Sequence, residues 1–433
     1  MATRKYPLGV ISLSSVEMWE RFSFYTMQSL LVLYAAAKIS DGGLGWSNER
    51  ALLLTGYYGA LVYVSPIIGG IIADKIIGRK MAVLLGAIIM MFGHASLAFA
   101  GETMMYVGIA LLITGCGLLK PSISAMVGEF FTNAETSAKE SAFAIFYMSI
   151  NIGGFLGPMI GGYVQQEKGF PWAFGMAAFG LLLGIINFLM TKNRSLKGIG
   201  ELKAKHDLIK EIKEPWTRLE KTKVWVYLVL CVSNIFWNII YALPYGLLTL
   251  YADKNIDRHI GSFLIPATWY FGLYGLLIII YSPIIAVFYR AYKGNLGRDM
   301  YLGTKLGVAY LLIVAGCFVL LPLVEHIGAN PQYVGSSWYL IGFYTLFALS
   351  ELLTVPVLLS AATTFAPKGF SATLVSLNMA ISWAIGAWLG GVFGAMTQEY
   401  NPTIIFKWTI ALSAVFALGQ FLTSKMLENI MHK

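Results

Sequence analysis

The stretch SVEMWERFSFYTMQSLLVLY, residues 15–34, has the composition of a membrane helix but carries three ionisable side chains in its first two turns. A helix that crosses a bilayer needs about 20 mostly apolar residues. Glu17, Glu20 and Arg21 stand at i, i+3 and i+4, so a helix places them on one face. Each ionisable group at membrane depth costs about 2.5–3.5 kcal/mol on insertion scales. The face must therefore lie against protein or a water-filled cavity.

The composition of the whole chain is that of a membrane protein. Of its 433 residues, 57% are hydrophobic and only 12% are charged, and the mean hydropathy is +0.68. Soluble domains carry about a quarter charged residues. We predict an all-α polytopic membrane protein with twelve transmembrane helices. The twelve apolar segments are 13–38, 50–73, 80–100, 103–128, 141–163, 171–191, 224–250, 263–289, 302–322, 337–362, 371–397 and 402–426.

The twelve segments fall into two groups of six, separated by a basic, polar stretch. We predict an N-terminal six-helix bundle at 1–192, a cytoplasmic linker at 193–223 and a C-terminal six-helix bundle at 224–433. This is the layout of the major facilitator superfamily, in which substrate binds between the two halves.

The loop GGIIADKIIGRKMAV (69–83), between the second and third segments, resembles the loop signature of that superfamily. Its glycines permit close helix packing, and Asp74 can pair with basic residues or helix ends. We assign Asp74 and Arg79 to a cytoplasmic gate. An ordinary positively charged loop is the alternative reading of the same residues.

The placement of lysine and arginine predicts the orientation. With a cytoplasmic N-terminus, 23 of the 31 Lys and Arg residues fall on cytoplasmic segments and 5 on the opposite side. Both termini are therefore expected in the cytoplasm, and the protein in the cell (inner) membrane. The anionic inner leaflet also accounts for the net charge of +9, so no nucleic-acid partner is expected. No cleavable signal peptide is expected either.

Two further ionisable side chains stand at membrane depth. Lys120 lies directly before Pro121, which frees a backbone carbonyl and bends a helix. Glu351 is equally central in its segment, near Pro356. Cations in the N-terminal half and a carboxylate in the C-terminal half would satisfy the two ends of a zwitterion. The carboxylates beside a lysine would supply a titratable pair for proton coupling.

Other function classes find little support. The five histidines and three cysteines are scattered singly and show no metal-ligand spacing. We therefore predict no catalytic residues, no metal site and no cofactor other than protons as the coupling ion. The chain is not expected to be an enzyme.

Four motifs, in order, resemble those of the proton-dependent oligopeptide transporter (POT) family, a branch of the major facilitator superfamily. EMWERFSFY (17–25) is similar to its first-helix motif, and GLLKPSIS (117–124) to its fourth-helix lysine segment. FYMSINIGGFLGP (146–158) is similar to its fifth-helix signature, and SELLTVP (350–356) to its tenth-helix glutamate segment.

The resemblance implies a role for each polar residue. Lys120 would pair with a carboxylate of the proton-coupling cluster, and the amine of the substrate would meet Glu351 and Asn151. The implied proton-coupling residues are Glu17, Glu20, Arg21 and Lys120. The expected substrate-binding residues are Arg21, Tyr25, Gln28, Tyr63, Lys120, Asn151, Glu351 and Asn378.

The chain departs from the family pattern at several positions. Gln28 stands where an arginine is usual, and Tyr241 and Ala242 stand where the seventh helix of the family carries a carboxylate. Tyr274 replaces an Asn-Pro pair, and Asn378 replaces a binding tryptophan. Many bacterial members insert a helical hairpin between the halves, whereas only the linker at 193–223 stands here. The proton-coupling residues are retained, but the C-terminal substrate wall is altered.

The sequence thus predicts a proton-coupled symporter that imports di- or tripeptides, or peptide-like zwitterions, by alternating access as a monomer. The alternative keeps the mechanism and changes the cargo to another small polar molecule, such as an amino-acid derivative, a peptide-like natural product or an anion.

Overall fold

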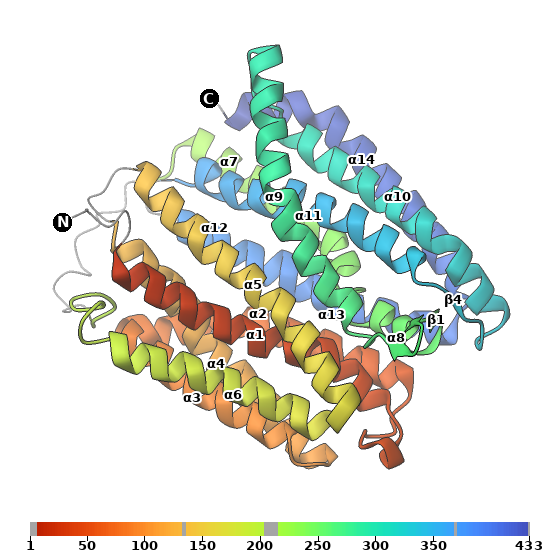
Figure 1. Cartoon of the computed structure of the whole chain (residues 1–433). Coiled ribbons are helices and arrows are strands. Elements are labelled where there is room, and N and C mark those ends of the chain that lie inside the picture. Colours follow the sequence, from red (N-terminus) through yellow and green to blue (C-terminus); the bar gives the residue numbers. More distant parts are fainter. Residues whose placement is uncertain (1–6, 132–135, 203–214, 368–369, 432–433) are drawn as a thin grey trace. The chain divides into compact units, whose positions relative to one another are not determined.

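The computed structural model describes residues 7–131, 136–202, 215–367 and 370–431, and almost all of these are helical (Figure 1). The α-helices are α1 (Leu8–Ala36), α2 (Asn48–Ile72), α3 (Arg79–Leu97), α4 (Glu102–Glu129), α5 (Thr136–Lys168), α6 (Phe170–Thr191), α7 (Arg218–Tyr241), α8 (Leu247–Lys254), α9 (Trp269–Leu296), α10 (Leu302–Ala329), α11 (Trp338–Phe365), α12 (Ser371–Asn378), α13 (Ile385–Glu399) and α14 (Pro402–Met431). Two π-helical stretches, Ala73–Ile77 and Met379–Ala384, continue α2 and α12. The strands are β1 (Ile256–Asp257), β2 (His259–Ile260), β3 (Phe263–Leu264) and β4 (Gly335–Ser336).

Eleven helical stretches within the described residues are long and apolar enough to cross a membrane. α1 is not among them, because Glu17, Glu20 and Arg21 lower its hydropathy. Its 29 residues nevertheless extend about 44 Å, longer than the hydrocarbon core of a bilayer. With α1 added, these helices agree in number with the twelve predicted segments.

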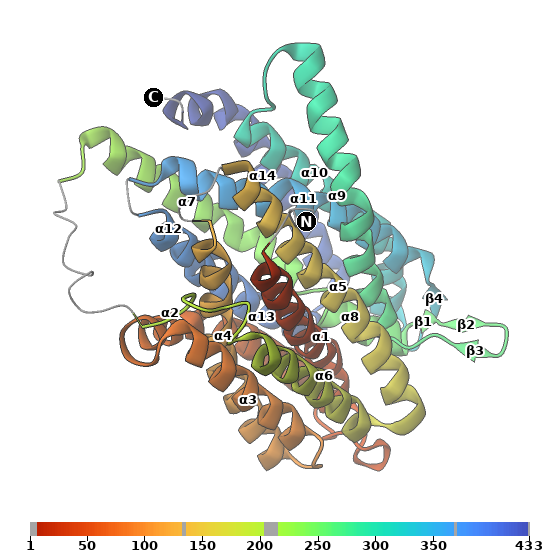
Figure 2. The same ribbon diagram turned by 60° about the vertical axis from the view of Figure 1, so that its left-hand side comes forward.

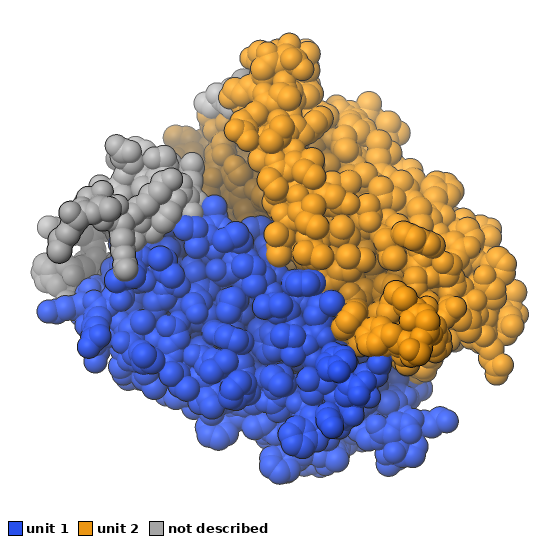
Figure 3. Space-filling view, viewed as in Figure 1, with its two compact units in different colours: residues 1–47, 58–213 blue, residues 48–57, 214–433 orange. Residues whose placement is uncertain are grey.

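The chain forms two compact units, which comprise residues 1–47 with 58–213 and residues 48–57 with 214–433 (Figure 3). In the first unit, α1 packs against α5 and α6, and α3 packs against α4 and α6. In the second unit, α10 packs against α11 and α14, α9 against α11, and α7 against α13. The predicted linker 193–223 stays a prediction, and its residues 203–214 lie outside the described part of the chain.

Glycines on α5 bring its backbone close to α1. A Cβ atom at Gly153 would lie 2.4 Å from the carbonyl oxygen of Met18 and 2.8 Å from Cβ of Arg21. One at Gly157 would lie 2.5 Å from the carbonyl oxygen of Phe22. Small residues allow membrane helices to approach this closely. α5 therefore packs directly on the turn of α1 that carries the charged residues.

The predicted seventh segment, 224–250, is not one helix. α7 ends at Tyr241, and α8 begins only after a turn at 242–246. Pro244 in this turn has no backbone N–H to donate to a helix. Its carbonyl oxygen accepts hydrogen bonds from the hydroxyls of Thr249 at 2.8 Å and Tyr344 at 3.2 Å.

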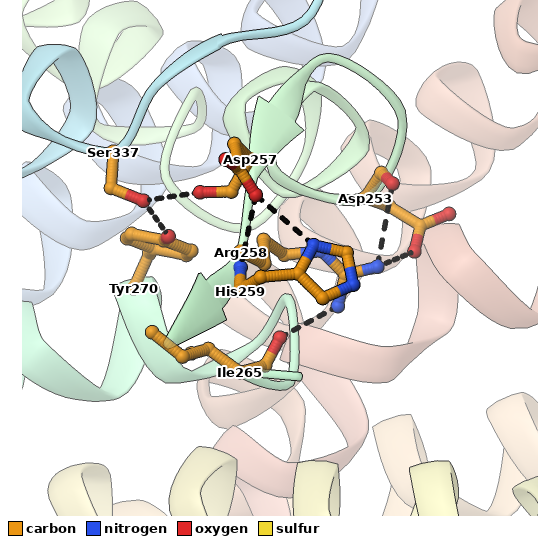
Figure 4. A network of polar contacts seen from close by, with 7 residues as sticks. All are labelled: Asp253, Asp257, Arg258, His259, Ile265, Tyr270 and Ser337. Atoms are coloured by element: carbon orange, nitrogen blue, oxygen red, sulfur yellow. Dashed lines mark hydrogen bonds and ion pairs between the residues drawn. The ribbon is translucent and has the colours of Figure 1, made fainter. Parts of the chain in front are cut away.

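The predicted eighth segment begins later than expected, because residues 263–264 form β3 and α9 starts at Trp269. β3 pairs antiparallel with β2, and β1 pairs in parallel with β4 (Figure 2). Figure 4 shows the polar contacts around these strands. The hydroxyl of Ser337 donates to the carbonyl oxygen of Asp257 at 2.9 Å and also hydrogen-bonds the hydroxyl of Tyr270.

Arg258 and His259 complete this network. Arg258 donates to the carbonyl oxygen of Ile265 at 2.7 Å and pairs with the carboxylate of Asp253 at 3.1 Å. The backbone N–H of His259 donates to Oδ1 of Asp257 at 3.1 Å, and its ring Nδ1 lies 3.0 Å from the same oxygen. These contacts, the backbone one first, hold the pKa of the Asp257 carboxyl below its ordinary value.

Candidate functional site

The three charged residues of α1 form one buried, ion-paired group. Nε of Arg21 lies 3.1 Å from Oε1 of Glu17 and also donates to Oε2 of Glu20. The side chains of Arg21, Glu17 and Glu20 are 4%, 3% and 0% exposed. The structure thus brings together the residues that share a face in the sequence. One guanidinium serves two carboxylates, so the group carries one negative charge in excess when both carboxylates are ionised.

Several atoms of this group have no hydrogen-bond partner among the residues that the structure describes. They are Oε2 of Glu17, Oε1 of Glu20, Nη2 of Arg21 and, two turns further along α1, Oε1 of Gln28. Buried polar atoms are normally hydrogen-bonded, and the exceptions call for an explanation. The carboxylate oxygens are free to take a proton, and Nη2 of Arg21 is free to donate to an anionic group.

Aromatic rings contact the cations of the first unit. Nζ of Lys120 lies 4.6 Å from the ring centroid of Tyr63 and 6.0 Å from that of Phe24. Cζ of Arg21 lies 4.9 Å from the same Phe24 centroid. Such cation–π contacts are worth about 0.5–2 kcal/mol, depending on how far the cation is desolvated. Within the described residues no ion pair includes Lys120, so its pairing with a carboxylate stays a prediction.

Glycines let α2 and α4 approach closely near Tyr63 and Lys120. A Cβ atom at Gly69 would lie 2.1 Å from the carbonyl oxygen of Gly117. One at Gly117 would lie 2.9 Å from the carbonyl oxygen of Ser65. The contact between Lys120 and Tyr63 is thus made between two tightly packed helices.

The other N-terminal residues predicted to bind substrate lie on α1 and α5. Tyr25 is half-buried, and a Cβ at Gly154 would lie 3.2 Å from its ring. Gln28 is 3% exposed. Nδ2 of Asn151 donates to the carbonyl oxygen of Tyr147 in the same helix at 2.9 Å. Their role in substrate binding stays a prediction.

The predicted gate loop forms a chain of ion pairs that includes a residue not identified from sequence. Arg79 lies 2.7 Å from the carboxylate of Asp74 and 2.6 Å from that of Glu129, the last residue of α4. The second carboxylate oxygen of Glu129 accepts the backbone N–H of Gly200 at 2.7 Å. The loop is thereby tied to α4 and to the segment that follows α6. No local sequence signal marks Glu129, because its partners are distant along the chain.

In the second unit, Glu351 stands on a firmly anchored stretch of α11. It is 8% exposed, and its Oε2 has no hydrogen-bond partner among the described residues. The neighbouring Ser350 accepts a hydrogen bond from the indole N–H of Trp237 at 3.0 Å and donates to the carbonyl oxygen of Ala309 at 2.9 Å. α7 and α10 therefore hold this turn of α11 and the carboxylate beside it.

An aromatic cluster is the feature of the second unit that sequence reasoning missed. It surrounds Tyr241, which replaces the usual carboxylate of the family pattern. The ring partners of Tyr241 and their centroid distances include Trp237 (5.6 Å), Trp383 (5.1 Å), Tyr245 (6.2 Å), Phe347 (6.3 Å) and Tyr274 (6.5 Å). Tyr274 is another departure from the family pattern. Because its ring contacts that of Tyr241, the two departures belong to one packed aromatic wall.

Asn378, where the family pattern has a tryptophan, is 2% exposed and comes directly before the π-helix. Oγ of Ser382 lies 2.7 Å from its Oδ1 and 2.8 Å from the carbonyl oxygen of Cys231 on α7. Ser382 thus links the π-helix to α7. The predicted role of Asn378 in substrate binding stays a prediction.

The charged residues of α1 with Lys120 form one set of polar groups, and Glu351 provides another in the second unit. Groups of these kinds can exchange protons and bind charged parts of a small molecule. Within the described residues no group of three or more His, Cys, Asp and Glu side chains could hold a metal ion.

The chain is similar in sequence to known membrane transporters. The model of the POT family matches residues 80–205 and 216–412. The transporter YclF of Bacillus subtilis (strain 168) is 31% identical over 467 aligned residues, which cover 96% of this chain and 92% of that protein. A di-/tripeptide transporter of Lactococcus lactis subsp. cremoris is 27% identical, with 91% of each chain covered.

A solved structure of a peptide transporter of this type, in complex with sulfate, superposes with a TM-score of 0.88 at 28% identity. The match covers 100% of this chain and 97% of that one. The predicted major facilitator fold is thereby confirmed over the full length.

Proposed function

The chain belongs to the POT family of membrane transporters, and we propose that it imports di- or tripeptides, or peptide-like zwitterions, by proton-coupled symport. It is a multi-pass membrane protein and a transporter, not an enzyme. The further proposal places both termini in the cytoplasm and the protein in the cell (inner) membrane, since the basic residues concentrate on one set of loops.

The observation that carries the proton coupling is the shared guanidinium of α1. Glu17 and Glu20 both contact Arg21, and each keeps one buried oxygen without a partner among the described residues. A proton on either carboxylate removes the excess negative charge of this buried group. Lys120 neutralises the same charge if it moves from Tyr63 to a carboxylate. The proton and Lys120 therefore compete for one charge, which is the basis of coupling.

The cargo completes this exchange. The carboxylate of a zwitterion would bind Lys120 and the free Nη2 of Arg21. Its amine would bind Glu351, whose buried Oε2 is likewise without a partner in the described structure. Charge-assisted hydrogen bonds of this kind are about twice as strong as neutral ones. Alternating access would then move proton and cargo together, and each proton contributes about 2.3 kcal/mol per 100 mV of membrane potential.

A second candidate keeps this mechanism with a different small polar cargo. It is favoured by the aromatic wall around Tyr241 and Tyr274, which replaces polar residues of the family pattern, and by Gln28 in place of an arginine. Such a wall suits a cargo with a bulky apolar part beside its charged ends.

Uptake into proteoliposomes tests both candidates. Purified protein would be reconstituted, and entry of a labelled dipeptide measured with and without an inward proton gradient. Accumulation that requires the gradient supports symport, and equal uptake without it contradicts symport.

Competition by a free dipeptide, an N-acetylated dipeptide, a dipeptide amide and single amino acids then identifies the cargo class. Gradient-driven uptake of some other small polar molecule, with no uptake of any dipeptide, would favour the second candidate.

A further inference from the structure

A groove of about 620 Å³ runs between α7 and α14, within the second unit. Its walls are mainly apolar, and several of its side chains are openly exposed. Trp225 is 68% exposed, Val229 64% and Met426 54%. The apolar face of a membrane helix normally meets lipid, so a groove here is a place for an acyl chain.

The length of the groove along α7 matches the thickness of one leaflet of the hydrocarbon core. Near the start of α7, beside the C-terminal end of α14 (Figure 1), Nζ of Lys223 donates to the carbonyl oxygen of Met431 at 3.3 Å. Further along, Nε2 of Gln420 donates to Oγ of Ser233 at 3.5 Å. Ser233 lies ten residues beyond Lys223, which is about 15 Å of helix. Half of the hydrocarbon thickness of a bilayer is also about 15 Å.

One end of the groove is positively charged. Arg218 and Lys221, at i and i+3 in the first turn of α7, are exposed and line it. No carboxylate is among the described residues that line the groove. Glu220, which stands between the two cations in sequence, is engaged elsewhere. Its Oε2 accepts the backbone N–H of Thr217 at 2.8 Å in the capping box of α7.

We infer that this groove binds an anionic glycerophospholipid. The phosphate lies between Arg218 and Lys221, and one acyl chain lies along Trp225 and Val229 towards Ser233. Basic pockets between membrane helices recognise anionic headgroups in this way. A free phosphate would use only the charged end, whereas a lipid uses the cations and the apolar groove together. The inference is independent of the transported cargo.

Gly419 of α14 provides a test of the apolar part. A Cβ atom at this position would meet nothing within 4 Å, although the residue lines the groove. A Cβ atom there meets no neighbour, so a large side chain can start into the groove, and it replaces a poor helix former. Gly175 of α6 is an equally open helical glycine in the first unit, so Gly175→Phe is the matched control for Gly419→Phe.

Native mass spectrometry of the full chain measures the binding, with phosphatidylglycerol and phosphatidylcholine of identical acyl chains as probes. We expect the wild type to retain phosphatidylglycerol preferentially. Loss of each basic residue should weaken this binding roughly fivefold, so Arg218→Gln/Lys221→Gln should weaken it roughly 25-fold. The double variant Arg290→Gln/Lys425→Gln removes two exposed cations of the same unit and should bind as the wild type does. Gly419→Phe should lose the lipid, and Gly175→Phe should keep it.

Three results with the lipid probes would overturn the inference. They are equal retention of the two lipids by the wild type, equal losses in the two charge variants, and unchanged binding by Gly419→Phe. Displacement of the lipid by inorganic phosphate or glycerol phosphate would show a headgroup site without use of the groove, and would also contradict it. The thermal unfolding of each variant checks its fold. If the double variant at 218 and 221 does not fold, Lys221→Gln alone carries the same test with a roughly fivefold effect.

Discussion

The ammonium of Lys120 lies over the ring of Tyr63, 4.6 Å from its centroid, while Arg21 is the one cation of the described residues that pairs with both Glu17 and Glu20. The lysine of this cluster is thus held by an aromatic ring, and its charge remains available. A cation–π contact is weak compared with a buried ion pair. A proton or a cargo carboxylate can therefore decide where Lys120 binds.

Lys120→Ala should abolish proton-driven accumulation. The change removes the cation that competes with the proton for the Glu17–Glu20 charge, so a proton gradient can no longer be linked to movement of the cargo. The measurement is concentrative uptake in proteoliposomes under an inward proton gradient. Lys407→Ala is the control, because Lys407 is largely exposed and pairs with Glu325 at 3.0 Å. Unchanged accumulation by Lys120→Ala would contradict the coupling role.

Glu351→Gln should weaken the binding of substrates that carry a free amine and leave the binding of other substrates unchanged. A hydrogen bond to a charged group is worth about 1.5–3 kcal/mol, and a neutral one about 1 kcal/mol. The expected cost is therefore roughly tenfold in apparent affinity for a free dipeptide and little for its N-acetylated form.

Competition by the two peptides in the wild type and in Glu351→Gln measures this difference. Ser350→Ala is a useful comparison, because it loosens the same turn of α11 without a change of charge. If Glu351→Gln lowers the affinity for both peptides equally, Glu351 does not recognise the amine.

Gly153→Ala should destabilise the first unit. Its new Cβ would lie 2.4 Å from the carbonyl oxygen of Met18, so α5 must move away from α1. Overpacking of this kind costs about 1–3 kcal/mol. The melting temperature of the purified protein should fall, and the Glu17–Arg21 contact should weaken with it. Gly175→Ala, where a Cβ meets nothing within 4 Å, should melt no lower than the wild type, since alanine is the better helix former. Equal melting of both variants would mean that the α1–α5 contact is less tight than described.

The sequence predicts the parts of this molecule that have a local signal. The charges of α1 share a face by their spacing alone, and the long apolar segments reveal the helices. The break after Tyr241 is hidden, because a proline within an apolar run is also common in continuous membrane helices. Glu129 and the aromatic wall of Tyr241 could not be found in this way, since their partners come from distant segments. Which rings meet is decided by helix packing, and no short motif records it.

The strands near His259 provide a pH-dependent prediction outside the membrane-spanning helices. The Asp257 carboxyl has a lowered pKa because His259 hydrogen-bonds its charged form. A carboxyl with a pKa depressed in the folded state stabilises the fold above its unfolded value, near 4, and loses that contribution as the pH falls through the folded value. The loop at 255–265 should therefore lose protection as the pH falls below about 4.

His259→Ala removes the ring contact and should raise the pKa of Asp257 towards its ordinary value, so the loop opens at a higher pH than in the wild type. Hydrogen exchange of residues 255–265, corrected for the intrinsic pH dependence of exchange, measures this shift. His326→Ala is the control, because the His326 ring contacts the carbonyl oxygen of Pro322 and not Asp257. The backbone N–H of His259 still donates to Asp257 in the variant, so the shift should be partial. A profile of His259→Ala identical to that of the wild type would show that the ring does not stabilise the carboxylate.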